Sequence, residues 1–247
     1  MLFRSVERLT FPKPADWRRP APPHKGEGMT VTLKLATSLD GRIATASGES
    51  QWITGPEARE QVHRLRADHH AVVIGIETAL ADDPELTVRL PGYKGRQPVR
   101  VVLDTGQRLP PACKLVQTAC DIPTIVVAMG PPDPMLTEAG VQVLILPPTS
   151  ETRPDLRLVV QALGAQGLIN LFVEGGGQVA GSFLRCGLVD ALEWFRAPIV
   201  LGLEGRPSIG SLAVAALSDA PHFRRVEVSQ LGDDLWERYA LVAKEGG

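Results

Sequence analysis

Short apolar runs alternate with amphipathic segments through most of the chain. The runs with strand character are rich in β-branched residues and cover residues 30–36, 71–76, 99–103, 124–128, 141–146 and 168–173. Glycine or proline bounds most of them, which is typical of strands buried in a parallel sheet. Helical spacing of apolar residues separates several of these runs, at residues 56–67, 77–81 and 156–163, and it resumes beyond residue 176. The alternation predicts an α/β fold with helices on both faces of a mostly parallel central sheet.

The pattern changes after residue 188. Residues 190–200, 223–228 and 235–242 are strand-like, and no long helical segment separates the last two. Such consecutive strands predict an antiparallel edge that completes the parallel sheet. Since neither an internal repeat nor a linker interrupts the chain after residue 28, we expect residues 29–247 to form one domain.

The first 28 residues differ in composition from the rest of the chain. They contain five prolines among basic residues, at Pro12, Pro14, Pro20, Pro22 and Pro23. This composition predicts an extended arm or tail. Phe3, Phe11 and Trp17 could dock the arm on its own domain or on a partner subunit, and a solvated segment is the alternative.

Composition and charge restrict the class of partner. The 247 residues carry a formal net charge of −2, which gives no overall attraction to nucleic acid or to an anionic membrane. Any phosphate must therefore be bound by local basic groups, and a small molecule is the expected partner. Because no apolar run approaches the roughly 18 residues that span a bilayer, and no signal peptide is evident, we expect a cytoplasmic protein.

The cysteines and histidines form no pattern typical of a metal site. Cys113, Cys120 and Cys186 are three in number and widely spaced, which fits neither a disulfide framework nor a CxxC pair. The five histidines include no HExxH motif and no zinc deaminase signature. We therefore expect reduced cysteines and no bound metal.

Three consecutive glycines lie between the apolar run at 168–173 and the helical spacing that follows it. Val173, Glu174 and residues 175–177 predict a strand-to-helix turn at the carboxyl end of a parallel strand, where α/β sheets bind ligands. Glycines there would let a phosphate approach the backbone, and the next helix would offer unpaired N–H groups. A tight turn without a ligand is the alternative. The chain contains no GxxxxGK[ST] loop, and its GxGxxxG spacing alone is a weak signal.

Five segments in register are similar to one known family. They read KLATSLDGRIA at 34–44, SQWITG at 50–55, Arg59 with HRLRA at 63–67, GIETALADDPELTVR at 75–89, and VEGGG at 173–177. Together they resemble the reductase domain of the bifunctional riboflavin-biosynthesis deaminase/reductase, over about residues 30–245. The resemblance implies a dihydrofolate-reductase-like fold, NADPH as cofactor and a homodimer. It also implies reduction of the ribose of 5-amino-6-(5-phosphoribosylamino)uracil to a ribityl chain.

The deaminase domain of that family has no counterpart in this sequence. Only the 28 proline-rich residues precede the reductase-like segment, and they carry none of the zinc ligands. We therefore expect a stand-alone reductase. Whether it acts before or after deamination stays open, as does the preference for NADPH over NADH.

The resemblance also implies binding residues. Positions that contact the dinucleotide in the family match Ala36, Trp52, Thr78, Asp82, Gly176, Gly177, Gln178, Val179, Ala180, Gly181 and Ser182. Positions that contact the substrate match Ser50, Arg66, Leu86, Arg89 and Glu174. Arg66 and Arg89 suit a sugar phosphate, because a guanidinium group can bind phosphate with two parallel hydrogen bonds.

Hydride transfer to an opened ribosylamine needs a proton donor, and three residues are candidates. We hypothesise that Lys34 or Asp82 polarises or protonates the opening ring, and that Glu174 holds the pyrimidine or a ribose hydroxyl. Each residue also has a structural alternative. Lys34 could be an ion-pair partner, Asp82 a turn residue, and Glu174 an acceptor for backbone N–H groups.

Two other functions stay open at this point. One is a dihydrofolate-reductase-like NADPH oxidoreductase that acts on another pyrimidine or on a pteridine-like compound. The other is a nucleotide-binding protein without catalytic activity. Both arginines favour the phosphorylated substrate, and the presence of Lys34, Asp82 and Glu174 argues for catalysis.

Overall fold

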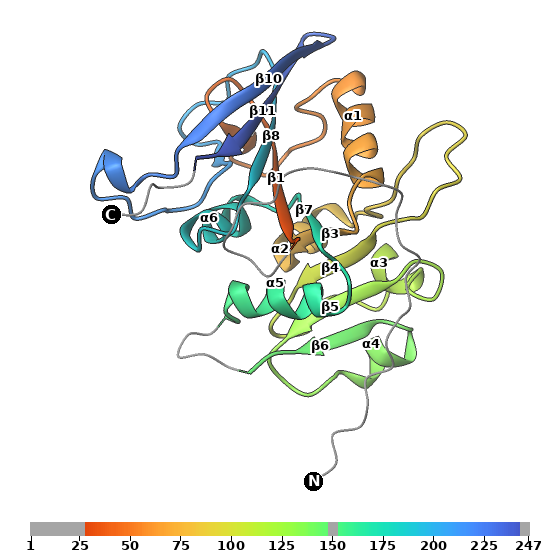
Figure 1. The fold of residues 1–247 in the computed structure, drawn as a ribbon. Coiled ribbons are helices and arrows are strands. Elements are labelled where there is room, and N and C mark those ends of the chain that lie inside the picture. Colours follow the sequence, from red (N-terminus) through yellow and green to blue (C-terminus); the bar gives the residue numbers. More distant parts are fainter. Residues whose placement is uncertain (1–27, 148–152, 243–247) are drawn as a thin grey trace.

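A single large sheet organises the part of the chain that the computed structural model describes, residues 28–147 and 153–242. Its nine strands lie in the order β10-β11-β8-β1-β7-β3-β4-β5-β6 (Figure 1). The predicted arm at residues 1–28 lies outside the described residues except for Gly28. The strands are β1 (Thr30–Thr37), β3 (Ala71–Gly75), β4 (Val99–Leu103), β5 (Thr124–Ala128), β6 (Gln142–Ile145), β7 (Asn170–Val173), β8 (Ala191–Arg196), β10 (Phe223–Leu231) and β11 (Asp234–Leu241).

The strand directions confirm the predicted topology. All neighbours from β8 to β6 are parallel, whereas β11 runs antiparallel to both β8 and β10. Strands β7 and β8 are shorter than the predicted runs at residues 168–173 and 190–200. The N–H of Leu168 donates to the carbonyl of Leu163, so Leu168 closes the preceding helix and does not begin β7. After Arg196 the chain turns, and the N–H of Ile199 donates to the carbonyl of Ala197.

Helices cover both faces of the sheet, as the alternation predicts. They are α1 (Pro56–Ala67), α2 (Ile76–Asp82), α3 (Lys114–Gln117), α4 (Pro134–Glu138), α5 (Leu156–Ala165) and α6 (Gly177–Arg185). Helices α5 and α6 pack on one face, and α1 to α4 pack on the other (Figure 1). The short helices α3 and α4 were not predicted, because four or five residues are too few to show helical spacing.

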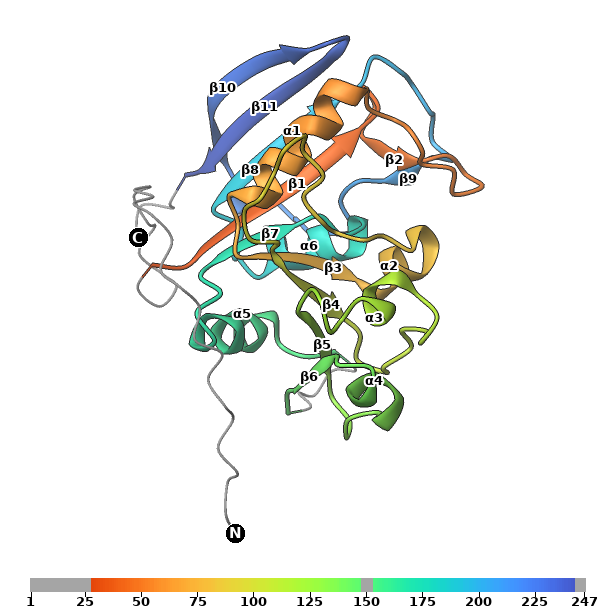
Figure 2. The ribbon, with the colours of Figure 1, turned by 90° about the vertical axis from the view of Figure 1, so that its right-hand side faces the viewer.

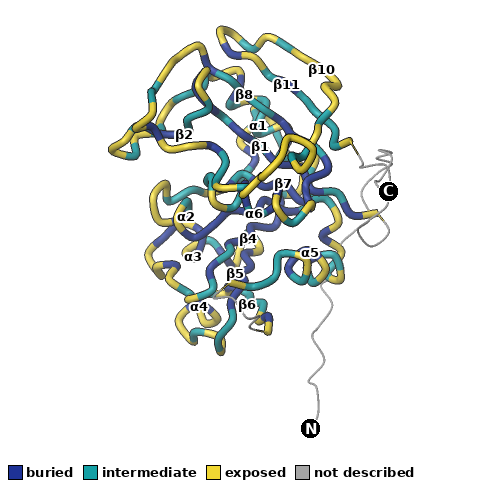
Figure 3. Tube along the Cα trace, turned by 90° about the vertical axis from the view of Figure 1, so that its left-hand side faces the viewer, coloured by how far each residue is buried: buried dark blue, intermediate teal, exposed yellow. Residues whose placement is uncertain are grey.

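Alternate side chains of each strand enter two separate hydrophobic cores. Val31 and Leu33 of β1 lie in the core under α5 and α6, together with Phe183 of α6. Ile74 of β3 and Phe172 of β7 lie in the core on the opposite face. The buried residues accordingly follow the sheet in Figure 3. Both faces are buried, which explains why the central strands are continuously apolar in sequence.

The predicted long loop at residues 37–55 contains a short strand. This strand, β2 (Arg42–Ala44), pairs antiparallel with β9 (Arg206–Pro207), as Figure 2 shows. Asp40 fixes the start of the loop, where its carboxylate accepts from the hydroxyl of Ser38 and from the N–H groups of Leu201 and Gly202. These hydrogen bonds, led by that of Ser38, lower the pKa of Asp40 to about 2.

A fully buried arginine stabilises the loop after α3. Arg100 of β4 donates to the carbonyls of Leu115, Thr118 and Ile122, at 3.1, 3.1 and 2.8 Å, and to the hydroxyl of Thr118 at 2.7 Å. Burial lowers the pKa of Arg100 to about 10, so the group stays charged at neutral pH. The guanidinium therefore holds the connection from α3 to β5 in place.

The substitution Arg100→Met should lower the free energy of unfolding by at least about 3 kcal/mol, because it leaves several buried acceptors without a donor. Urea denaturation measures this loss. Arg64→Met is the control: Arg64 makes an exposed ion pair with Glu60 one turn away, and its loss should cost less than about 0.5 kcal/mol. Equal losses in the two variants would contradict the structural role of Arg100.

Candidate active site

A cleft of about 1910 Å³ runs along the carboxyl ends of the parallel strands. Its floor is formed where β3, β4 and β7 end, at Gly75, Leu103 and Glu174. The loop before α1 and the segment at 206–210 form its walls. Pockets for one small molecule are commonly about 300–1000 Å³. The cleft, hereafter the central cleft, is therefore large enough for a dinucleotide and a second ligand.

Most of the predicted site residues line the central cleft. Those that line it are Lys34, Ala36, Ser50, Trp52, Arg66, Thr78, Asp82, Arg89, Glu174, Gly176, Gly177, Gln178, Val179 and Ser182. Leu86, Ala180 and Gly181 are buried and do not line it. Ala180 faces the hydrophobic core from the inner side of α6. The structure thus brings residues from five distant segments together around the central cleft, and it places Leu86, Ala180 and Gly181 outside the cleft.

Arg66 and Glu174 form a nearly buried ion pair that joins α1 to the end of β7. The Nε and Nη2 of Arg66 donate to the two carboxylate oxygens of Glu174, at 2.6 and 2.9 Å. The Nη1 of Arg66 donates to the carbonyl of Thr87 at 2.9 Å. These two parallel N–H bonds of Arg66 are made to Glu174, and the binding of phosphate by Arg66 stays a prediction. One N–H on each terminal nitrogen remains for a ligand.

The ion pair determines the charge of Glu174. Burial raises the pKa of this carboxyl, but the charge and hydrogen bonds of Arg66 outweigh burial and hold the pKa below its ordinary value. Glu174 is therefore an anion throughout the neutral range. The structural alternative for Glu174 is an acceptor for backbone N–H groups, but both of its carboxylate oxygens accept from Arg66.

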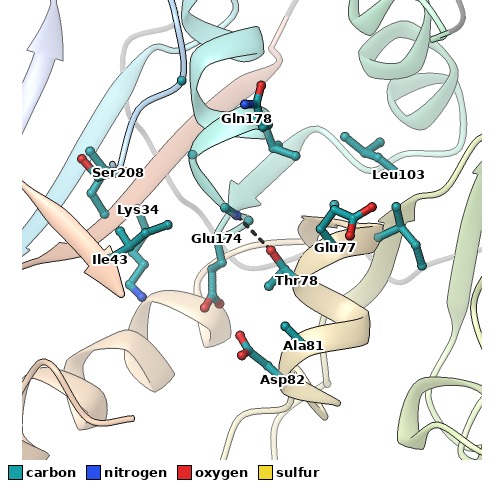
Figure 4. A pocket seen from close by; sticks show the side chains of 18 of the residues that line it. Lys34, Ile43, Glu77, Thr78, Ala81, Asp82, Leu103, Glu174, Gln178 and Ser208 are labelled. Carbon is teal, nitrogen blue, oxygen red and sulfur yellow. Dashed lines mark hydrogen bonds between the residues drawn. The ribbon is translucent and has the colours of Figure 1, made fainter. Parts of the chain in front are cut away.

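Lys34 lies on the same side of the sheet as this pair. Its side chain points into the central cleft beside Glu174 (Figure 4). Burial lowers the pKa of Lys34, and so does the charge of Arg66, while Glu174 and Asp82 act in the opposite direction. No hydrogen bond or ion pair within the described ranges involves its ammonium group. Lys34 is thus available to a ligand.

Asp82 is the last residue of α2, and its carboxyl group faces Lys34 and Glu174 across the cleft (Figure 4). The turn expected at this point follows directly, because Asp83 has φ 39° and precedes Pro84. Burial raises the pKa of Asp82, and the charge of Lys34 opposes this only in part. Asp82 therefore retains a proton to higher pH than an ordinary aspartate. A raised carboxyl pKa next to a lowered ammonium pKa suits proton transfer near neutral pH.

The glycine turn has a structural cause that the sequence does not reveal. A Cβ at Gly175 would lie 2.8 Å from the backbone nitrogen of Gly75, and one at Gly181 would lie 2.9 Å from the carbonyl oxygen of Gly210. A Cβ at Gly177 would collide with the carbonyl oxygen of Pro207. These three glycines are therefore required by contacts within the protein, whether or not a phosphate approaches the turn.

The turn still presents backbone donors to the central cleft. The N–H of Gly176 donates to the hydroxyl of Thr78 at 3.0 Å, which ties the turn to α2 (Figure 4). Helix α6 begins at Gly177, so the N–H groups of its first turn have no partner within the helix. Gly177, Gln178 and Val179 line the cleft at this point. The arrangement suits an anion at the start of α6.

Positive charge is concentrated along the central cleft. The arginines that line it are Arg59, Arg66, Arg89, Arg108, Arg153, Arg157, Arg185 and Arg206. Several were not predicted as site residues, because they lie far apart in the sequence and share no motif. Asp104, Thr105 and Gly106 also line the cleft and were missed. Their position directly after a parallel strand is the signal that could have identified them.

Residues 28–147 and 153–242 contain neither a cluster of metal ligands nor a helix that could span a membrane. No three histidine, cysteine, aspartate or glutamate side chains in these ranges lie close enough together to hold a metal ion. None of the helices there is both long and apolar enough to cross a bilayer.

Comparisons with known proteins identify the family to which the chain belongs. The family model of the RibD C-terminal domain matches residues 29–236. Riboflavin biosynthesis protein RibD of Escherichia coli is 38% identical over 216 residues, which cover 83% of this chain and 58% of that protein. The 2,5-diamino-6-ribosylamino-4(3H)-pyrimidinone 5′-phosphate reductase of Methanothermobacter thermautotrophicus is 35% identical, over 85% of this chain and 97% of that protein.

A solved structure of Acinetobacter baumannii RibD is also similar. It superposes with a TM-score of 0.77 at 34% identity, over 87% of this chain and 59% of that one. The chain thus spans a little over half the length of the RibD proteins that it matches, but nearly the full length of the methanogen reductase.

The substitution Arg66→Met should leave the carboxylate of Glu174 buried without its partner and lower the free energy of unfolding by about 3–5 kcal/mol at pH 7. Without the guanidinium, burial raises the pKa of Glu174 above its value in the unfolded chain. Protonation should therefore restore part of the stability as the pH falls from 7 to 5, whereas the intact ion pair gives no such gain. Urea denaturation at several pH values measures the difference.

The double variant Arg66→Met/Glu174→Gln is the control, because it has no carboxyl group at position 174 to titrate. Its loss of stability should be smaller than that of Arg66→Met at pH 7 and should not change over this range. A pH-independent loss in Arg66→Met would show that Glu174 is not held as an anion by this pair.

Proposed function

We propose, because the chain belongs to the RibD C-terminal domain family, that it is a reductase of riboflavin biosynthesis. The proposed reaction is NADPH-dependent reduction of the ribosyl group of 5-amino-6-(5-phosphoribosylamino)uracil, or of its non-deaminated precursor, to the ribityl form. One observation carries the proposal. Lys34, Asp82 and Glu174 face one space, beside a helix N-terminus that suits a pyrophosphate and arginines that suit a sugar phosphate (Figure 4).

The donor set fits a nicotinamide dinucleotide. The unpaired N–H groups at the start of α6 suit its pyrophosphate, and Thr78 fixes the turn that presents them. The arginines along the central cleft offer partners for a further phosphate, which supports NADPH over NADH. When bound, the cofactor supplies the hydride.

The substrate would occupy the half of the central cleft between α1 and β1. Ser50, Arg89 and the remaining N–H groups of Arg66 lie there and can bind its phosphate. Glu174 is an anion at neutral pH, so it can accept hydrogen bonds from the pyrimidine or from a ribose hydroxyl. This placement brings C1 of the ribose towards Lys34 and Asp82.

The reaction takes up one proton overall. When the ring opens, the bond from C1 to the ring oxygen breaks, the nitrogen lone pair forms a C=N bond, and the oxygen takes up that proton, which leaves a positively charged iminium group. When the hydride adds to C1, the electron pair of the C=N bond returns to the nitrogen and gives the neutral amine without a further proton. Asp82 is suited to donate because its pKa is raised, and Lys34 can donate or stabilise the charge that develops.

Oxidation of NADPH, followed by absorbance with each of the two pyrimidines generated in situ, tests the reaction. Lys34→Met and Asp82→Asn should each lower kcat by about 100-fold or more, because general acid catalysis commonly contributes that much. Lys114→Met and Asp83→Asn are matched controls. These two residues form an exposed ion pair outside the cleft, so both controls should keep wild-type turnover. Near-normal kcat in both Lys34→Met and Asp82→Asn would contradict the acid assignment.

We also propose that the chain forms a homodimer through the edge strand β10. This strand lies at one end of the sheet and exposes Val226 and Val228. If two copies pair antiparallel about Val226, Arg225 of each copy lies opposite Glu227 of the other. In this arrangement each copy places a positive side chain opposite a negative side chain of the other. The symmetric pairing would also give hydrogen-bond partners to the backbone N–H and C=O groups on the outer edge of β10.

The substitution Val226→Lys should convert the dimer into a monomer, because it places two like charges opposite each other at the centre of this pairing. Size-exclusion chromatography with light scattering measures the mass. Val200→Lys changes an exposed valine on a loop away from β10 and should leave the dimer intact. A dimer that persists in Val226→Lys would place the interface elsewhere.

A further inference from the structure

His63 lines the central cleft, but the proposed reaction gives it no role. It lies on the same face of α1 as Arg59 and Arg66, one turn away from each, and its side chain is half-buried. Arg89 faces it from the segment after α2, and Glu174 faces it from the end of β7. His63 is therefore surrounded by the groups that are proposed to receive the phosphate end of the substrate.

Two backbone contacts of His63 meet at its Nδ1. This atom lies 3.0 Å from the carbonyl oxygen of Thr87, and the N–H of Arg89 donates to it at 3.3 Å. A protonated Nδ1 donates to Thr87, whereas a bare Nδ1 accepts from Arg89, so the two contacts favour opposite tautomers of the neutral ring. In the protonated ring both nitrogens carry a proton, so Nδ1 donates to Thr87 and Nε2–H is available to an anion.

The surroundings keep this ring neutral in the absence of a ligand. Burial lowers the pKa of His63, and the charges of Arg66 and Arg89 lower it further. The carbonyl of Thr87 and the carboxylate of Glu174 act in the opposite direction but do not prevail. A phosphate dianion placed between these arginines would reverse the balance, because it brings about two negative charges to the same space.

We propose that His63 is a phosphate ligand that takes up a proton when a sugar phosphate binds in the central cleft. The inference rests on the proposed function, since the phosphate is that of the proposed substrate. It assigns a binding role to a fourth side chain beside Ser50, Arg66 and Arg89. It also links substrate affinity to pH.

The sign of the pH dependence follows from the proton uptake. The complex needs a protonated ring, whereas the free ring is neutral at pH 7. The dissociation constant of the sugar phosphate should therefore rise about tenfold per pH unit between the pKa of the free ring and that of the bound ring. Because the phosphate itself titrates near pH 6, the effect is clearest above about pH 6.5.

A nuclear magnetic resonance titration of the histidine imidazole signals against pH tests this proposal, with ribose 5-phosphate as the probe and ribose as its uncharged control. Saturating ribose 5-phosphate should raise the pKa of one histidine by about one unit or more, and ribose should not. The variant His63→Gln lacks the imidazole of His63, so the signal that is missing from its spectrum is the signal of His63. His63→Asn serves the same purpose if the glutamine variant does not fold.

His70→Gln is the matched control. His70 is also half-buried beside an arginine, its pKa is also lowered by burial, and it lies outside the central cleft. The signal that responds to phosphate should persist in His70→Gln. An increase of less than one unit at His63, or a response that disappears with His70, would overturn the proposal.

Steady-state kinetics separate this proposal from the proposed function. The KM for the phosphorylated pyrimidine should rise with pH above neutrality in the wild type and should be independent of pH in His63→Gln. The same pH dependence in both proteins would overturn the role of His63 and leave the reductase activity standing. If neither pyrimidine is reduced, the proposed function fails, and the titration with ribose 5-phosphate still decides the role of His63.

Discussion

The ion pair between Arg66 and Glu174 is the interaction on which the rest of the site depends. It joins a helix on one face of the sheet to the carboxyl end of a central strand, and its charged atoms are almost wholly buried. It keeps Glu174 ionised, and its guanidinium contributes to the lowered pKa of Lys34. The carbonyl of Thr87 extends the network to His63. The pKa values of Lys34, Glu174 and His63 therefore each depend on the charges of their neighbours in this network.

Close approach of backbone segments is the second constraint. The first turn of α6 packs against residues 207–210, so that Gly177 and Gly181 leave no space for a Cβ, and the N–H of Gly210 donates to the carbonyl of Gly177 at 2.7 Å. The same segment continues from β9, which pairs with β2 in the loop after β1. The wall of the central cleft is thus assembled from three distant parts of the chain. Small residues in the glycine turn permit this packing, and the N-terminus of α6 stays open to an anion.

Positive charge in the central cleft would allow a protein with a net charge of −2 to bind the proposed phosphorylated cofactor and substrate. The fold collects arginines from α1, α6 and several loops around one space. Opposite pKa shifts of Asp82 and Lys34 arise in the same space, because burial disfavours the charged form of each. A carboxyl that keeps its proton and an ammonium that releases one more readily are suited to a reaction that takes up a proton.

The sequence by itself determined the parallel strands, the longer helices, the antiparallel edge and the position of the glycine turn, because burial and periodicity are local properties of the chain. The family motifs also located Lys34, Asp82 and Glu174. Only the tertiary structure decided that Arg66 binds Glu174, that the glycines serve backbone packing, that Leu86, Ala180 and Gly181 lie outside the cleft, and that β2 pairs with β9. Each of these features joins residues far apart in sequence, and no local pattern specifies which distant group a side chain will meet.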